Sequence, residues 1–244
     1  MNKTFLSNGI TVISQVNKNT PRTAVTFYLC LDKPEEKAGV NVLLNRLFLQ
    51  GTKTRSAEEI ANETEENAID LYSEMKTDYL RFKGLCLNED FDYMLELMQD
   101  IMLNSTLESF DKEVIKMKGE IQAELDSPKA KAYDNFYKTL FENHPYGHTS
   151  TKILENIDNI TREEVQKTYD EILTNSKKII SVVGDFDEQE LLKMLEKHFG
   201  KMNNNENYSC KTPNYELVED KLSCIEKDDA KQAQILEGWI FPTY

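Results

Sequence analysis

Two pairs of strand-like segments in this chain are each joined by a very short polar turn. Residues 4–6 and 10–14 flank Ser7-Asn8-Gly9, and residues 70–76 lie just before residues 79–87. Asn-Gly tolerates the positive φ angles of a tight hairpin turn, and strands joined by so short a turn pair antiparallel. With a third strand at residues 24–31, the sequence predicts a mostly antiparallel sheet.

Helical segments alternate with these strands. The first helix is expected at residues 40–48, where apolar residues recur at i, i+3, i+4, i+7 and i+8. It therefore has one buried face, and Gly51 ends it. Ser56 and Glu59 form a capping box that starts a second helix, and Thr161 with Glu164 starts a later one. Further helices are expected at residues 91–103 and 108–125, after Pro128 and after residue 187, with a strand at 178–183. The predicted class is α+β, with helices packed on one face of the sheet.

The pattern changes after residue 200. Residues 201–219 have the polar, turn-rich composition of a linker, whereas residues 224–227 and 232–241 resemble strands with no helix to cover them. We therefore expect a first domain at residues 1–200, a linker at 201–219, and the opening strands of a second, similar domain at 220–244.

The composition argues against several classes of partner. The 43 acidic residues exceed the 29 basic ones, which gives a net charge of -14 that repels phosphate backbones and anionic lipid headgroups. No apolar run approaches the length of a membrane-spanning helix, and the four cysteines form no C-x-x-C pair. We expect a cytoplasmic protein that binds neither nucleic acid nor membrane.

Histidines offer one possible metal site. His144 and His148 are four residues apart with Glu142 nearby, but Pro145 and Gly147 between them interrupt helical geometry. A structural loop is the main interpretation, and a metal site remains an alternative. The sequence contains no G-x-S-x-G nucleophile motif and no Gly-rich phosphate loop.

Residues 39–52 resemble the zinc helix of the pitrilysin and insulinase family, in particular its processing-peptidase branch. Gly39 and Gly51-Thr52 match the residues that bracket that helix. His144-Pro145-Tyr146-Gly147 and Val182-Val183-Gly184-Asp185-Phe186-Asp187 resemble the family's later loop and closing strand, in the same order. The resemblance covers residues 8–241, which is nearly the whole chain.

The family's zinc helix carries His-x-x-Glu-His, in which two histidines four apart bind the metal and the glutamate is the general base. At these three positions the chain has Val42, Asn45 and Arg46. Val42 has no lone pair, Asn45 cannot accept a proton at neutral pH, and Arg46 is permanently charged. The resemblance also implies that Glu120 stands at the third ligand position, with Glu113 two turns earlier on the same helix face.

One remaining carboxylate is too few for a zinc site, so no metal and no catalytic residue is expected in this chain. We hypothesise that Arg46 takes the place of the metal by pairing with Glu120 or Glu113 across two helices. The resemblance further implies a peptide-binding edge strand at Leu71, Tyr72, Ser73 and Glu74, although these differ from the family's Asn-Ala core. A solvated or internally paired edge, with Glu74 pointing outward, is the alternative for that strand.

The resulting functional interpretation is a non-catalytic half or subunit of the family, binding peptide or an active partner that carries the zinc. Two alternatives remain open. One is a stand-alone scaffold or interaction protein with no peptidase partner. The other is a zinc endopeptidase with an unorthodox site formed by His144, His148 and a glutamate.

Overall fold

A computed structural model of the chain describes residues 1–209, 221–226 and 232–240. Within these residues, six strands form one sheet in the order β1-β2-β6-β3-β5-β4, and only the β2–β6 pair is parallel. The mostly antiparallel sheet expected from the sequence is therefore confirmed. The strands are β1 (Asn2–Phe5), β2 (Thr11–Val16), β3 (Arg22–Cys30), β4 (Asp70–Met75), β5 (Tyr79–Leu87) and β6 (Lys177–Gly184).

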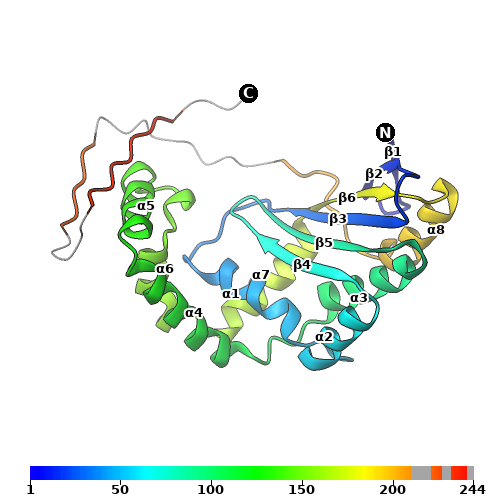
Figure 1. Cartoon of the computed structure of the whole chain (residues 1–244), viewed down its shortest axis with the longest axis horizontal. Helices are drawn as coiled ribbons and strands as arrows, with labels where there is room; N and C mark the ends of the chain where they lie inside the picture. The colour runs from blue at the N-terminus through cyan, green and yellow to red at the C-terminus, as the bar shows by residue number, and fades with distance from the viewer. Residues whose placement is uncertain (210–220, 227–231, 241–244) are drawn as a thin grey trace.

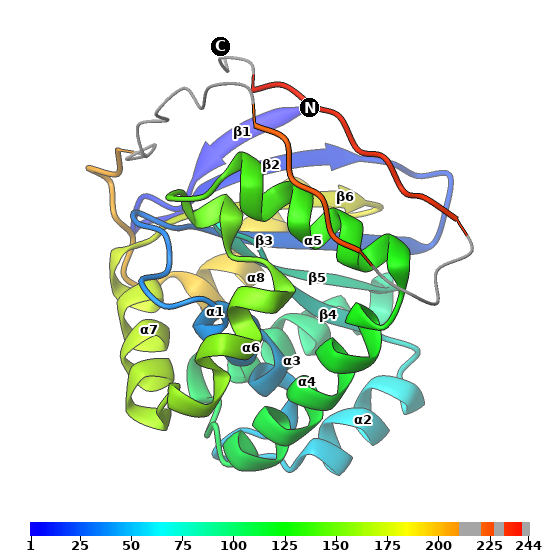
Figure 2. The ribbon, with the colours of Figure 1, turned by 90° about the vertical axis from the view of Figure 1, so that its left-hand side faces the viewer.

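The helices lie on one face of this sheet. Figure 1 shows α1, α2, α3 and α7 on one side of the strands, and in Figure 2 the group α4, α5 and α6 faces the viewer. This arrangement confirms the α+β class with helices on one face. The helices are α1 (Val40–Leu47), α2 (Ala57–Glu66), α3 (Phe91–Asn104), α4 (Phe110–Leu125), α5 (Pro128–Leu140), α6 (Ser150–Asn156), α7 (Arg162–Asn175) and α8 (Glu188–Phe199).

The core fills the space between sheet and helices. Along β3, Val25, Phe27 and Leu29 are fully buried, whereas the residues between them are only half-buried. Phe27 pairs in register with Phe82 and Ile180 on the neighbouring strands, and its ring contacts Phe199 of α8 at a centroid distance of 4.9 Å. The alternation places every second side chain of the central strands in the core.

The first hairpin is confirmed, but its connection is longer than a two-residue turn. Gly9 has φ +79°, as the Asn-Gly pair predicts, while the Leu6 backbone N–H donates to the carbonyl of Ile10. The Asn8 side chain accepts a hydrogen bond from the Ile10 backbone N–H through Oδ1, and its Nδ2 donates to the backbone carbonyls of Phe199 and Met202. This turn ties the end of α8 to the sheet, which a local turn preference does not reveal.

Helix starts follow the sequence closely. Complete capping boxes are present at Ser56 with Glu59 and at Thr161 with Glu164, and the Asp187 side chain caps α8. The short helix α6 was not expected, because Ile153 is its only buried residue and it follows the Pro-Gly loop. No helix in the described part of the chain is long and apolar enough to cross a membrane.

The prediction of strands near the C-terminus is wrong for the residues that can be checked. Residues 221–226 and 232–240 contain no strand, and the rest of the predicted strands at 224–227 and 232–241 lies outside the described residues. An extended segment becomes a strand only when another strand pairs with it, and no partner strand is found in the described ranges. The division into domain, linker and second domain remains a prediction.

One buried cation lies at the start of β6. The Lys178 side chain is fully buried, and its Nζ donates to the carbonyl of Leu173 at 2.9 Å and to Ser176 O and Oγ at 3.1 Å each. Burial lowers the pKa of Lys178 to about 8, because the charged amine loses water.

Candidate functional site

Helix α1 is held in a tightly packed position. It packs against α7, α4 and β4, and Leu43, Leu44 and Leu47 are fully buried. Gly39, just before it, has φ +104°, and a Cβ there would lie 3.0 Å from Cγ2 of Ile153. Both the backbone angle and the space therefore require glycine.

The N-terminus of α1 is capped from the preceding loop, which the sequence did not reveal. Gly39 has no side chain to act as a cap, and Glu35 Oε2 instead accepts a hydrogen bond from the Asn41 backbone N–H at 2.8 Å. Glu35 Oε1 lies 3.0 Å from His148 Nδ1. The absence of Ser, Thr, Asp or Asn immediately before the helix was the signal that a more distant acceptor was needed.

The three positions of the degenerate motif lie on α1. Val42 is 38% exposed, and Arg46 occupies the last turn with a side chain that is 22% exposed. Asn45 is half-buried, and its backbone carbonyl accepts a weak hydrogen bond from Ser73 Oγ of β4 at 3.4 Å. The motif helix therefore lies directly beside the edge strand of the sheet.

Arg46 bridges to two carboxylates on α4. Its Nε donates to Glu113 Oε2 at 2.9 Å, and its Nη1 donates to Glu120 Oε2 at 2.8 Å. The hypothesis that Arg46 pairs with Glu120 or Glu113 is confirmed, and the structure adds that both pairs form at once. Glu113 is buried with a side chain only 3% exposed, whereas the side chain of Glu120 is 53% exposed.

These contacts fix the charges of the cluster. Burial by itself lowers the pKa of Arg46, but the hydrogen bonds to Glu120 and Glu113 more than offset it, so that the pKa is raised. The hydrogen bond from Arg46 lowers the pKa of Glu120. Arg46 is therefore positively charged and Glu120 negatively charged at neutral pH.

One polar atom beside the cluster is unsatisfied. Asn45 Oδ1 is buried and has no hydrogen-bond partner among the described residues. Buried polar atoms nearly always have a hydrogen-bond partner, so a buried acceptor without a donor is unusual. It lies on the residue that replaces the general base of the zinc motif.

The residues present do not fit a zinc ion. Zinc needs three or four donors, and the motif positions supply a hydrocarbon, an amide and a cation. Arg46 already uses Glu113 and Glu120. No group of three or more His, Cys, Asp or Glu side chains in the described part of the chain is arranged to hold a metal ion.

The predicted peptide-binding residues lie on β4, which is the last strand of the sheet. Leu71 and Ser73 are opposite buried residues of β5 and face the helices, whereas Tyr72 and Glu74 lie on the other face. Glu74 is paired within the sheet, with its Oε2 2.6 Å from Arg81 Nε. The free side of β4 has no neighbouring strand in the described ranges.

The two loop histidines do not form a second site. His144 Nδ1 accepts from the Tyr146 backbone N–H, and its ring contacts the ring of Tyr146. His148 faces Glu35, while Glu142 pairs with Lys221 on the protein surface. These three side chains therefore have separate structural partners.

A second arginine cluster lies nine residues further along the chain, and the sequence did not single it out. Arg55 Nη1 contacts Asp100 at 3.0 Å, Nε contacts Glu63 at 2.8 Å, and Nη2 contacts Glu96 at 3.1 Å. Asp100 also accepts from the hydroxyls of Thr52 and Thr54. Only the surplus of carboxylates on the neighbouring predicted helices pointed to such a cluster.

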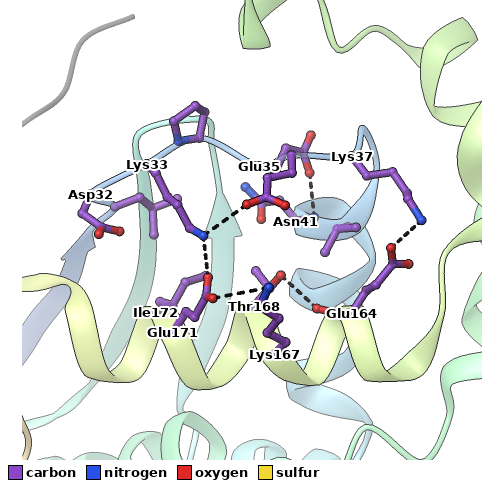
Figure 3. A pocket seen from close by; sticks show the side chains of 14 residues that line it. Asp32, Lys33, Glu35, Lys37, Asn41, Glu164, Lys167, Thr168, Glu171 and Ile172 are labelled. Atoms are coloured by element: carbon purple, nitrogen blue, oxygen red, sulfur yellow. Dashed lines mark hydrogen bonds and ion pairs between the residues drawn. The ribbon is translucent and has the colours of Figure 1, made fainter.

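A surface pocket lies beside the N-terminus of α1, between the loop before it and α7 (Figure 3). Its charged residues pair with one another: Lys33 lies 2.9 Å from Glu171, and Lys37 lies 2.5 Å from Glu164. The three motif positions are not part of its lining. The pocket is thus lined by surface ion pairs and lies next to the motif helix α1.

Comparison with protein families finds two matches. A model described as Insulinase (Peptidase family M16) matches residues 12–152, and one described as Peptidase M16 inactive domain matches residues 159–244. The first match includes the whole of α1 and α4, and so contains every residue of the Arg46 cluster.

Similar proteins include the mitochondrial-processing peptidase subunit beta of Neurospora crassa, 25% identical over 82% of this chain and 43% of that protein. An uncharacterized zinc protease, YmxG, of Bacillus subtilis is 23% identical over 79% of this chain and 48% of its own length. The chain thus spans a little under half the length of these relatives.

Solved structures share the fold. A protease from Helicobacter pylori superimposes with a TM-score of 0.77 at 24% identity, covering 87% of this chain and 53% of that one. A peptidase M16 inactive domain from Pseudomonas fluorescens gives a TM-score of 0.72 at 17% identity, covering 89% of this chain and 53% of that one.

Proposed function

The chain belongs to the insulinase family, peptidase family M16, and we propose that it is a non-catalytic member that binds peptide, an active zinc-bearing partner, or both. The observation that carries the proposal is the Arg46 cluster. A guanidinium held at 2.9 Å from Glu113 and 2.8 Å from Glu120 takes up the carboxylates that a metal would need. Neither Val42 nor Asn45 supplies a replacement ligand or base.

Retention of the fold supports a binding role. The core around α1 is intact, and the loss of metal ligands removes chemistry without removing a surface. The edge strand β4 lies beside Asn45, whose buried Oδ1 lacks a donor. An extended peptide can add to a free sheet edge through backbone hydrogen bonds, and β4 is the last strand of the sheet.

Partnership with a second chain has independent support. One similar protein is described as a subunit of a mitochondrial-processing peptidase. A non-catalytic member of a peptidase family can act beside a catalytic one. We therefore propose a zinc-bearing member of the same family as the partner.

The first experiment measures zinc content and peptide cleavage by the purified chain, using unstructured peptides of mixed sequence. We expect no stoichiometric zinc and no cleavage. The matched control is the triple variant Val42→His, Asn45→Glu, Arg46→His, which rebuilds the zinc motif opposite Glu120 and should take up zinc. One zinc per unmodified chain, with cleavage abolished by Glu120→Ala, would refute the proposal.

The second experiment isolates the chain from its native cells under gentle conditions. Recovery of a zinc-containing family member at equal stoichiometry supports the partner proposal. A lone chain, or a complex with unrelated proteins, supports a scaffold role instead. Chelator-sensitive cleavage that disappears with His148→Ala would favour the unorthodox peptidase.

A further inference from the structure

We propose that Arg46 is a built-in structural cation that joins α1 to α4, so that this junction needs no metal ion and excludes one. The inference concerns the stability of the fold. It stands whether or not the chain binds peptide or a partner, and its tests are separate from those of the proposed function.

The placement of the two carboxylates supports this role. Glu113 and Glu120 are seven residues apart on α4, which is about two helical turns, so both face the same neighbour. Each directs its Oε2 atom to a different nitrogen of one guanidinium. Arg46 itself lies in the last turn of α1, where the helix dipole favours a positive charge.

Burial makes the cation necessary. The Glu113 side chain is 3% exposed, and a carboxylate so far from water requires a compensating charge and hydrogen bonds. Arg46 supplies both. Removing it would leave Glu113 buried without its cation and Glu120 without its partner, with two like charges facing the same gap.

The chemistry of the guanidinium explains why it serves where a metal would not. It is planar and permanently charged, and its Nε and Nη1 edges offer separate donors to two carboxylates. A divalent ion entering the cluster would meet this positive charge and find only two carboxylates, both occupied. The same side chain therefore holds the helices together and keeps the position free of metal.

The test compares thermal unfolding of the unmodified chain with that of Arg46→Met, which keeps a long apolar side chain but removes the charge. We expect the Tm of Arg46→Met to fall by roughly 6–12 °C. The unmodified chain should show the same Tm with EDTA and with zinc chloride. Val42→Ala, on the same helix at a partly exposed position, is the matched control and should change the Tm by a degree or two.

A double variant separates charge compensation from packing. If Glu113 needs a cation, then Arg46→Met with Glu113→Gln should recover at least half of the lost Tm, since no buried charge remains. If Arg46→Met does not fold, Arg46→Lys takes its place, because one ammonium cannot reach both carboxylates in the same way and should give an intermediate Tm.

Three results would overturn the inference. One is a Tm of Arg46→Met or Arg46→Lys equal to that of Val42→Ala. The second is no recovery in the double variant. The third is a Tm of the unmodified chain that falls in EDTA and is restored by zinc chloride.

Discussion

The Arg46 and Arg55 clusters use the same side chain in two different settings. Both guanidinium groups bind carboxylates from other helices, and they are only nine residues apart in the sequence. Around Arg55, Asp100 is buried and receives hydrogen bonds from two threonine hydroxyls as well. Around Arg46, Glu120 is half-exposed and the neighbouring Asn45 Oδ1 has no donor.

The two clusters differ in how completely their polar atoms are paired and buried. Every oxygen of Asp100 has partners, since Oδ1 accepts from Asn104 and Oδ2 from Arg55 and the threonines. In the Arg46 cluster, Glu113 is buried and paired, whereas Glu120 is half-exposed and the buried Oδ1 of the neighbouring Asn45 has no donor.

The largest expected effect comes from Arg55→Ala. It leaves the buried carboxylate of Asp100 without its cation, and we expect a loss of about 3–5 kcal/mol in the free energy of unfolding. Lys53→Ala, an exposed position in the same loop, is the control and should change it by less than about 0.5 kcal/mol. Urea unfolding at pH 7 measures both. Equal losses in the two variants would mean that the Arg55 cluster is not structural.

Asp100→Asn should have the next largest effect, a loss of about 2 kcal/mol in the free energy of unfolding at pH 7. Burial raises the pKa of Asp100, but hydrogen bonds from Thr52, Asn104, Thr54 and Arg55 outweigh it and leave the pKa lowered. A lowered pKa means stabilisation above the unfolded value, near 3.9, that is lost as pH falls through the folded value. The difference in the free energy of unfolding between the unmodified chain and Asp100→Asn should therefore decrease from about pH 4 downward. A gap independent of pH would contradict this assignment.

Within the Arg46 cluster, the buried carboxylate should contribute more to the free energy of unfolding than the exposed one. Glu113→Gln should cost about 1–2 kcal/mol, because a buried ion pair with Arg46 is replaced by a hydrogen bond from Arg46 to an uncharged amide. Glu120→Gln should cost less than Glu113→Gln, since water solvates that side chain in either form. The two variants are each other's control in one unfolding experiment. The reverse order would show that the exposed pair dominates the cluster.

Salt should give the smallest effect. At about 1 M salt the screening length is roughly 3 Å, so the small Tm difference caused by Glu120→Gln should disappear. The difference caused by Asp100→Asn should persist, because water and ions do not reach that carboxylate. Loss of both differences in salt would remove the distinction between the two clusters.

Much of the fold follows from local signals in the sequence. The capping residues Ser56 and Thr161 fixed the starts of α2 and α7, and the apolar spacing of residues 40–48 predicted the buried face of α1. These features depend on residues only a few positions apart. The pairing of β2 with β6, and the link from Asn8 to α8, depend on segments more than 160 residues apart and had no local signal.

The candidate site shows the same limit. The three replaced motif positions and Glu120 were predicted from the resemblance to the family, and helix spacing placed Glu113 on the same face of α4 as Glu120. The orphaned Asn45 Oδ1, the cap from Glu35 and the contact of Ser73 with α1 were not, because they depend on how helices and strands pack. At the C-terminus, residues 224–227 and 232–241 were predicted to be strands, and the described residues among them form none.

Lys178 has a consequence that reaches beyond the site. Its amine is buried among neutral oxygens with a pKa of about 8, whereas the same amine in the unfolded chain has a pKa near 10.5. Around pH 9, folding therefore expels a proton into the solvent, and the measured heat of folding will change with the ionisation enthalpy of the buffer. The free energy of unfolding should rise with pH between about 8 and 10.5 on this account. In this narrow alkaline range, folding of the chain is therefore coupled to the release of a proton from Lys178.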